Sequence, residues 1–170
     1  MGNTKDVTQV GRTQVRSTLA TFISPPSIGG INQVFTAFPK RINFQTNALP
    51  SQVNRCAAVI FLESENETRI AVGGAHSGWK RIDYTVVIQL FHHSLERYAE
   101  DAMADLDNTI DDLKQLLRSD HNFGDPTGTL VWQGAEPDIT ATYGEPLSQN
   151  GNSIETWASI RFTVTQMIQA

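Results

Sequence analysis

Cysteine is nearly absent from the sequence, because Cys56 is the only one among 170 residues. A single cysteine cannot form an internal disulfide, and its isolation excludes a zinc site made of several cysteines. Cys56 opens the apolar run at residues 56–62, and such a position is typical of a buried, unreactive thiol. We therefore expect Cys56 to be a core residue.

Positive charge and long hydrophobic runs are also scarce. The 13 Lys and Arg residues are outnumbered by 18 Asp and Glu residues, so the net charge is −5, which disfavours binding to a phosphate backbone. No apolar run approaches the roughly 18 residues that a membrane span requires, and the first residues lack the apolar core of a secretory signal. We expect the protein to stay in the cytoplasm where it is made, without membrane contact.

Two helices are predicted from apolar residues that recur at steps of three and four. The shorter helix covers residues 8–23 and follows a flexible tail at residues 1–7. The longer helix extends from Ser94, whose hydroxyl can cap the first turn, to Arg118. Its apolar stripe consists of Ala99, Ala102, Met103, Leu106, Ile110, Leu113 and Leu117.

Strands are predicted between and after the helices. Residues 82–92 alternate between a fully apolar face and a mixed face, and residues 156–168 alternate between a buried and a solvated face. Residues 56–62 and 68–74 are predicted to be two strands joined by a charged turn at residues 63–67. Further strands are expected at residues 31–38, 129–135 and 138–143.

The order of these elements predicts the fold class. We expect an α+β fold, in which a mainly antiparallel sheet has the long amphipathic helix and the short N-terminal helix packed on one face. A single domain of residues 8–170 is long enough to bury a core. Two long polar loops, at about residues 39–55 and 144–155, interrupt it, and long loops in compact domains are often functional.

The histidines are the first candidates for catalysis or metal binding. His92 and His93 are adjacent, so on a strand their side chains point to opposite faces and cannot bind one metal ion together. His76 lies in a glycine-rich turn, and no carboxylate stands at a metal-ligand spacing from these residues. The favoured interpretation of the pair is a strand end that enters solvent.

Other catalytic motifs are incomplete. Residues 73–80 resemble a phosphate-binding loop, but Lys80 comes one position late and a strand follows where a helix is required. No serine stands in the Gly-x-Ser-x-Gly pattern of a nucleophile elbow. The acidic residues of the long helix are interpreted as a solvated or intersubunit face rather than a cation site. We therefore expect a protein that is not an enzyme and that uses no cofactor and no metal.

Three stretches of the sequence resemble the tail terminator family of long-tailed bacteriophages, whose architecture is related to that of the neighbouring tail-completion (neck) proteins. They are the strand and corner at residues 77–94 (SGWKRIDYTVVIQLFHHS), the acidic helix at residues 99–120 (AEDAMADLDNTIDDLKQLLRSD) and the closing strand at residues 156–166 (TWASIRFTVTQ). The resemblance covers about residues 9–168. It rests on the order of the elements and on their pattern of apolar and charged residues. The family has no catalytic residues to carry over.

The resemblance implies a structural virion protein at the head–tail junction, assembled in the cytoplasm of the host bacterium. It implies a homo-oligomeric ring of six subunits that caps the tail tube, stops tube polymerisation and offers a joining surface to the head connector. The implied partners are the major tail-tube protein and the head-completion or connector protein. DNA would pass through the lumen without specific binding, and an acidic wall would favour this by repulsion.

The same resemblance implies which residues make the contacts, since in such rings extended loops reach the last layer of tube subunits. The matching loops here are those at residues 39–55 and 144–155. Their candidate contacts with the tube or the connector are Lys40, Arg41, Asn43, Phe44, Gln45, Glu145, Leu147, Gln149 and Asn150. Candidates for an intersubunit or lumen face are Trp79, Arg81, Asp105, Asp111 and Asp112.

Other functions remain open at the level of the sequence. The chain could be another neck or tail-completion component, or a tail-tube subunit of the kind that stacks as many rings. From a different class, His76, His92 or His93 could serve a small metal-dependent hydrolase. A host interaction module with no viral role is a further alternative.

Elemental analysis of protein purified without added metal tests the hydrolase alternative. We expect no stoichiometric zinc, because the histidines do not have the spacing of metal ligands. Near-stoichiometric zinc that disappears in a His92→Ala/His93→Ala double variant would contradict this expectation.

Overall fold

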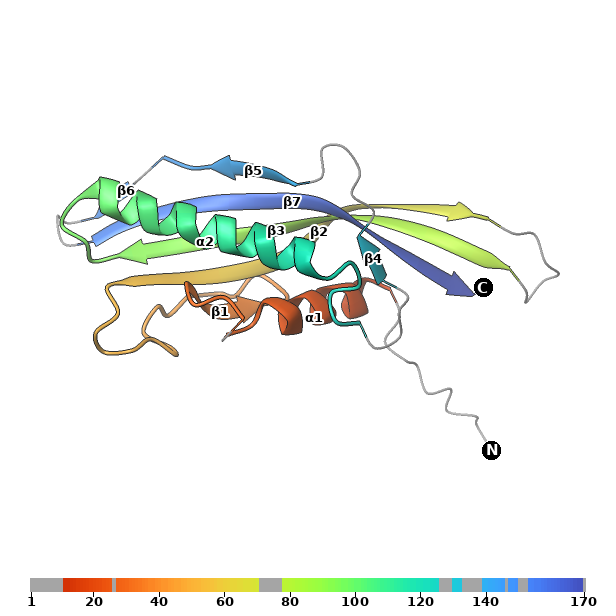
Figure 1. The fold of residues 1–170 in the computed structure, drawn as a ribbon, viewed down its shortest axis with the longest axis horizontal. Coiled ribbons are helices and arrows are strands. Elements are labelled where there is room, and N and C mark those ends of the chain that lie inside the picture. Colours follow the sequence, from red (N-terminus) through yellow and green to blue (C-terminus); the bar gives the residue numbers. More distant parts are fainter. Residues whose placement is uncertain are drawn as a thin grey trace, which may run out of the picture.

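Three long strands form the centre of the sheet: β2 (Asn54–Arg69), β3 (Trp79–Ser94) and β7 (Ser153–Gln169). β3 lies between the other two and is antiparallel to both; it pairs with β7 along its whole length and with β2 from Lys80 to Ser94 (Figure 1). A strand of 16 residues spans about 50 Å at roughly 3.3 Å per residue. This computed structural model describes residues 11–25, 27–70, 78–125, 130–132, 139–145, 147–149 and 153–169.

Four shorter strands complete the sheet. β1 (Ile31–Phe35) runs parallel to the beginning of β2, where its pairing covers Cys56 to Val59. β4 (Leu130–Trp132), β5 (Thr140–Tyr143) and β6 (Leu147–Gln149) each pair antiparallel with a different part of β7. The sheet therefore has β1 on one edge and three short strands in succession along the other.

Two helices contribute apolar side chains to the core. α1 (Arg12–Ile23) buries Val15, Leu19 and Ile23. α2 (Ala99–Ser119) buries six residues at helical spacing. Four of the six are leucine or isoleucine, and these four belong to the same hydrophobic cluster as the central strands. In the described part of the chain, neither helix has the combined length and apolar character needed to cross a bilayer.

The expected fold class is wrong. In the part of the chain that the structure describes, the fold is mostly a curled mixed sheet, with 45% strand and only two short helices, and no long amphipathic helix packed on a sheet face is shown there. The sheet is mixed because β1 pairs with β2 in the parallel direction. Hydrophobic periodicity reports which side of an element is buried. It does not report the direction in which strands pair or how far they continue once their residues become polar.

The expected turn at residues 63–67 is also wrong, because β2 passes through it as one continuous strand. The residues after Leu62 are exposed and polar, so they have the composition of a turn, yet they pair with β3 down to Arg69 and Lys80. A register shift between Leu62 and Ser64 interrupts the alternation at this point. Of the second expected strand, residues 68 and 69 belong to β2, and residues 71–74 lie outside the described residues.

The corner between β3 and α2 differs from the prediction as well. Ser94 is the last residue of β3, and α2 begins five residues later at Ala99. The Ser94 hydroxyl accepts a hydrogen bond from the Glu96 amide at 3.1 Å, so it caps a turn rather than the helix. Tyr98 occupies the N-cap position without a side-chain hydrogen bond. At the other end of the chain, the expected flexible tail at residues 1–7 lies outside the described residues.

A close contact between Gly30 and α2 generates a stability prediction. A Cβ atom on Gly30 would lie 2.4 Å from Thr109 Oγ1, which itself donates a hydrogen bond to the Asp105 carbonyl. We expect Gly30→Ala to lower the free energy of unfolding by about 1–3 kcal/mol through overpacking. Gly29→Ala is the matched control, because nothing lies within 4 Å of a Cβ at that position. Urea denaturation of both variants measures the effect, and equal losses would show that steric contact is not the cause.

Candidate interaction surface

The register of the sheet brings both predicted contact loops to the same end. β2 and β7 run in the same direction on either side of β3, so Asn54, Ser94 and Ile154 are level with one another. The loop at residues 39–53 leads into β2, and the loop at residues 144–152 leads into β7. We call this end of the sheet, where β2 and β7 begin and β3 ends, the loop end (Figure 1).

Side-chain amides of β1 hold the first loop in place. Gln33 Nε2 donates hydrogen bonds to the carbonyl oxygens of Asn43 at 2.6 Å and of Thr46 at 3.3 Å. Asn32 is buried, accepts a hydrogen bond from the Cys56 amide at 2.9 Å, and donates one to Gln52 Oε1 at 3.0 Å. The loop is therefore fixed to the sheet edge along much of its length.

The loop then covers part of the sheet face opposite the core. Strand alternation places Arg55, Ala57, Val59 and Phe61 on this outer face, whereas Cys56, Ala58 and Ile60 belong to the core. Phe38 packs against Phe61 with the ring centroids 5.1 Å apart. Ala57 and Val59 are fully buried despite their outward position. The polar composition of the loop does not indicate that the loop forms a second, smaller apolar layer on the outer face of the sheet.

His93 lies between the first loop and the beginning of β7. Its ring stacks on Phe44 of the first loop, with centroids 5.1 Å apart and an interplanar angle of 17°. Its Nδ1 atom lies 3.5 Å from Glu155 Oε1, at the beginning of β7. Arg55, His93 and Glu155 are successive partners across three strands, so their side chains share the outer face. An open cavity of about 420 Å³ adjoins this row, lined by Arg41, Ile42, Asn43, Phe44, Gln45 and His93.

The second loop is attached through Trp157. The Gly144 amide donates a hydrogen bond to the Trp157 carbonyl at 2.8 Å, and the indole ring lies directly against Gly144. Glu145 is exposed. Leu147 and Gln149 belong to β6 and pair with β7, although they were expected in a loop. Asn150 lies outside the described residues.

Exposed apolar side chains form a patch at the loop end that sequence reasoning missed. The Leu95 amide donates a hydrogen bond to the Val53 carbonyl at 2.9 Å, which places these two residues side by side. Leu49 lies in the turn just before Val53, and Tyr98 follows Leu95 at the start of α2, with the Arg97 guanidinium 5.5 Å from its ring centroid. The four residues of this apolar patch, Leu49, Val53, Leu95 and Tyr98, are between 43% and 67% exposed.

The residues expected at an intersubunit or lumen face are spread over the molecule. Trp79 is 47% exposed at the end of the sheet opposite the loop end. Nearby, Arg81 Nε donates a hydrogen bond to Asp83 Oδ1 at 3.0 Å. Asp111 and Asp112 are exposed on α2. These residues do not form one surface.

Asp105, the fifth of these residues, has a partner within the chain. Its Oδ2 atom lies 2.9 Å from Nε2 of His92, whose side chain is fully buried. His92 Nδ1 lies 3.4 Å from Thr156 Oγ1, so one histidine connects α2, β3 and β7. The expectation that His92 enters solvent at a strand end is wrong, whereas the placement of His92 and His93 on opposite faces is confirmed. His76 lies outside the described residues.

The groups that surround His92 are a thiol, a carboxylate and a hydroxyl. Cys56 pairs with His92 across the strands, but burial, together with the charge of Asp105, raises the pKa of the Cys56 thiol to about 12. A thiol with such a pKa is almost entirely protonated at neutral pH and is a poor nucleophile. Both His92 nitrogens already face Asp105 and Thr156. Among the described residues, no group of three or more His, Cys, Asp or Glu side chains is arranged to hold a metal ion.

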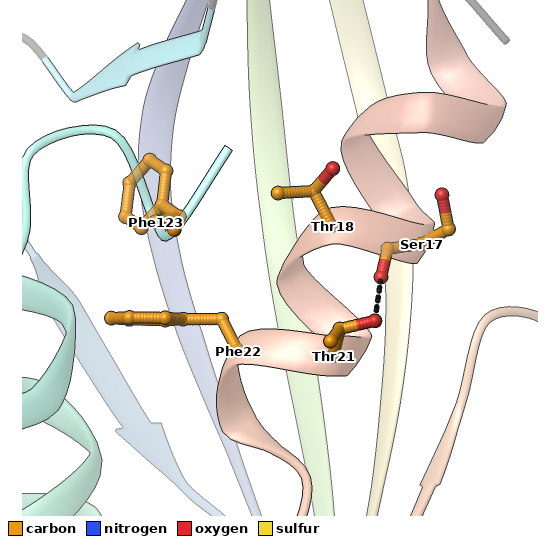
Figure 2. Close-up of a pocket in the computed structure, with 6 residues that line it drawn as sticks. Ser17, Thr18, Thr21, Phe22 and Phe123 are labelled. Carbon is orange, nitrogen blue, oxygen red and sulfur yellow. Dashed lines mark hydrogen bonds between the residues drawn. The ribbon is translucent and has the colours of Figure 1, made fainter. Parts of the chain in front are cut away.

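A second cavity, of about 390 Å³, lies between α1 and the turn that follows α2 (Figure 2). The Phe22 and Phe123 rings form one side in an edge-to-face contact, with centroids 5.9 Å apart. The Ser17 and Thr21 hydroxyls donate hydrogen bonds to helix carbonyls, so they are engaged within α1. The described residues that line the cavity carry no charge; they are Ser17, Thr18, Thr21, Phe22, Phe123 and Gly124.

Comparison with known proteins gives no relative: no family model matches the chain, and neither does any curated protein.

The contact between His92 and Asp105 generates a further stability prediction. Asp105→Ala leaves a nitrogen of a fully buried histidine without its partner, which costs about 1–3 kcal/mol of unfolding free energy. Asp112→Ala is the matched control, because Asp112 is an exposed residue of the same helix and the change has the same effect on helix propensity. Thermal and urea denaturation of both variants measure the difference. If Asp105→Ala proves as stable as Asp112→Ala, the buried contact does not hold α2 in place.

Proposed function

We propose that this protein is a structural component of a bacteriophage tail that forms a ring on the end of the tail tube. The ring stops tube polymerisation and presents a joining surface to the head connector. Its partners are further copies of this chain, the major tail-tube protein and the head-completion or connector protein, and it acts without catalysis or a cofactor. The proposal rests on the resemblance of residues 77–94, 99–120 and 156–166 to tail terminator proteins.

The observation that supports this function best is the position of both predicted contact loops at the same end of the sheet. The resemblance matches both loops to contacts with the tube or the connector, and His93 contacts Phe44 of the first loop and Glu155 at the beginning of β7. The apolar patch lies at the same end. Exposed apolar groups rimmed by polar ones mark protein interaction sites. Together these features favour a protein that binds other proteins at one end of an elongated sheet.

The charge of the molecule agrees with a DNA conduit. The net charge is −5, and α2 carries exposed acidic residues that include Asp107, Asp111 and Asp112. In a ring, heterologous interfaces close when the rotation between subunits permits. An acidic wall then lets DNA pass without adhering to it.

Electron microscopy of the purified protein tests the proposal against its nearest rival, a tail-tube subunit. We expect discrete single-layered rings, and native mass spectrometry should give six copies of the 18.8-kDa chain, or about 113 kDa. Long tubes formed spontaneously would identify a tube subunit instead.

A terminator can remain monomeric until a tube end is present. If the purified protein is a monomer, the order of the neighbouring genes provides the test. A gene placed between those for head-completion proteins and the major tail-tube protein supports the proposal, and a gene among unrelated functions contradicts it.

A further inference from the structure

The cavity between α1 and the turn that follows α2 lies at the end of α2 away from the loop end (Figure 2). Its volume of about 390 Å³ falls within the roughly 300–1,000 Å³ that small-molecule sites occupy. Because the described residues around it are uncharged, a charged ligand would lose its hydration there without gaining a counter-charge from them. The cavity therefore suits a neutral ligand.

The Phe22 ring supplies the apolar wall of this cavity. Phe22 is half-buried, so part of its side chain stays accessible, whereas Phe123 is 1% exposed and packs against it edge to face. A partly accessible aromatic ring can stack on a further ring, or meet its edge, with the ring centroids about 4.5–7 Å apart. An aromatic ligand therefore gains more from this wall than an aliphatic ligand of the same size.

A strained turn holds the Phe22 ring in position. Phe123 has a φ of 54°, in the left-handed region that residues other than glycine rarely adopt. The Asp120 carboxylate fixes this turn by accepting hydrogen bonds from the amides of Asn122 at 2.8 Å and of Gly124 at 2.9 Å. Backbone strain that the surrounding structure maintains in this way is concentrated at functional sites such as ligand clamps. The wall of the cavity is therefore formed before any ligand arrives.

The remaining side chains of the cavity are hydroxyls of α1. Ser17 Oγ donates a hydrogen bond to the Thr13 carbonyl at 2.8 Å, and Thr21 Oγ1 donates one to the Ser17 carbonyl at 3.0 Å. Their hydrogens are used, but each oxygen keeps lone pairs that can accept. The Thr18 hydroxyl makes no hydrogen bond with any described residue, and its oxygen is not buried. The cavity thus offers acceptors to a ligand that brings a donor.

We propose that this cavity binds a neutral aromatic ring that carries an O–H or N–H donor, as in a phenol or an indole. The ring packs on Phe22, and the donor bonds to the Thr18 hydroxyl oxygen. A cavity on the order of 150 Å³ holds a benzene ring, so this cavity also has room for a substituent. The site goes beyond the proposed function, because it does not depend on whether the chain forms a ring, a tube or neither.

Nuclear magnetic resonance titration of the full chain with p-cresol tests the site. We expect saturable shifts of the Thr18 and Thr21 methyl signals and of the Gly124 amide signal. The dissociation constant of so small a ligand is expected to be on the order of millimolar. Toluene, which lacks only the hydroxyl, should bind about twofold to tenfold more weakly because it forms no hydrogen bond. The anion p-toluate should not saturate the site.

Two variants locate the interaction. Thr18→Val keeps the shape of the side chain and removes the hydroxyl, so it should abolish the preference for p-cresol over toluene and leave toluene binding unchanged. Thr13→Val is the matched control, because Thr13 is an exposed residue of the same helix that does not line the cavity. Phe22→Leu removes the ring and should weaken binding of both ligands about twofold to tenfold. Since Phe22 also packs against the core, Thr18→Val is the decisive variant.

A last titration identifies the source of the ring. N-acetyl-tyrosinamide carries the same phenol on a peptide backbone. Binding at least as tight as that of p-cresol assigns the ring to a tyrosine side chain of a partner protein, and weaker binding assigns it to a free small molecule; both results support the site. Absence of saturable binding by p-cresol, equal affinity for toluene or p-toluate, or a preference for p-cresol that survives in Thr18→Val would overturn the proposal.

Discussion

The pairing of β3 with both of its neighbours is the interaction on which the rest of the structure depends. β3 pairs with β7 along all of its 16 residues and with β2 from Lys80 to Ser94. Such long registers fix each residue of three strands relative to the other two, because a slip by one residue would turn every buried side chain outward. This register determines the hydrophobic cluster, the row Arg55–His93–Glu155 and the position of two distant loops at one end of the sheet.

Local sequence patterns predicted which residues of a strand or helix face the core. The alternation in residues 82–92 correctly separates core residues such as Ile88 from outer residues, and it separates His92 from His93. What could not be predicted depends on partners that are distant in the chain. Residues 63–67 have the composition of a turn, yet they form a strand because β3 supplies the missing hydrogen bonds. Similarly, the parallel direction of β1 follows from the path of the connection to β2, which periodicity does not encode.

The candidate surface shows the same limit. The loops at residues 39–55 and 144–155 were identifiable by their polarity and length, but their convergence requires knowing that β2 and β7 flank β3 in the same direction. Arg55 follows a polar loop in the sequence and gives no sign of being buried there. His92 looked like the last residue of a strand, and its contact with Asp105 joins residues 13 positions apart through the tertiary fold. Apolar residues in a polar segment, such as Leu95 and Tyr98, are the one sequence signal that indicates the exposed apolar patch.

The short length of β1 has a consequence for solubility. β1 pairs with β2 only from Cys56 to Val59, and among the described residues no other strand pairs with that edge of β2 as it continues to Arg69. An open strand edge is a template for uncontrolled aggregation, and charged side chains are a common protection. This stretch carries Glu63, Glu65 and Glu67, each in an ion pair with a cation from another element. These glutamates give the strand the composition of a turn, and they also protect the open edge of β2 from pairing with a strand of another molecule.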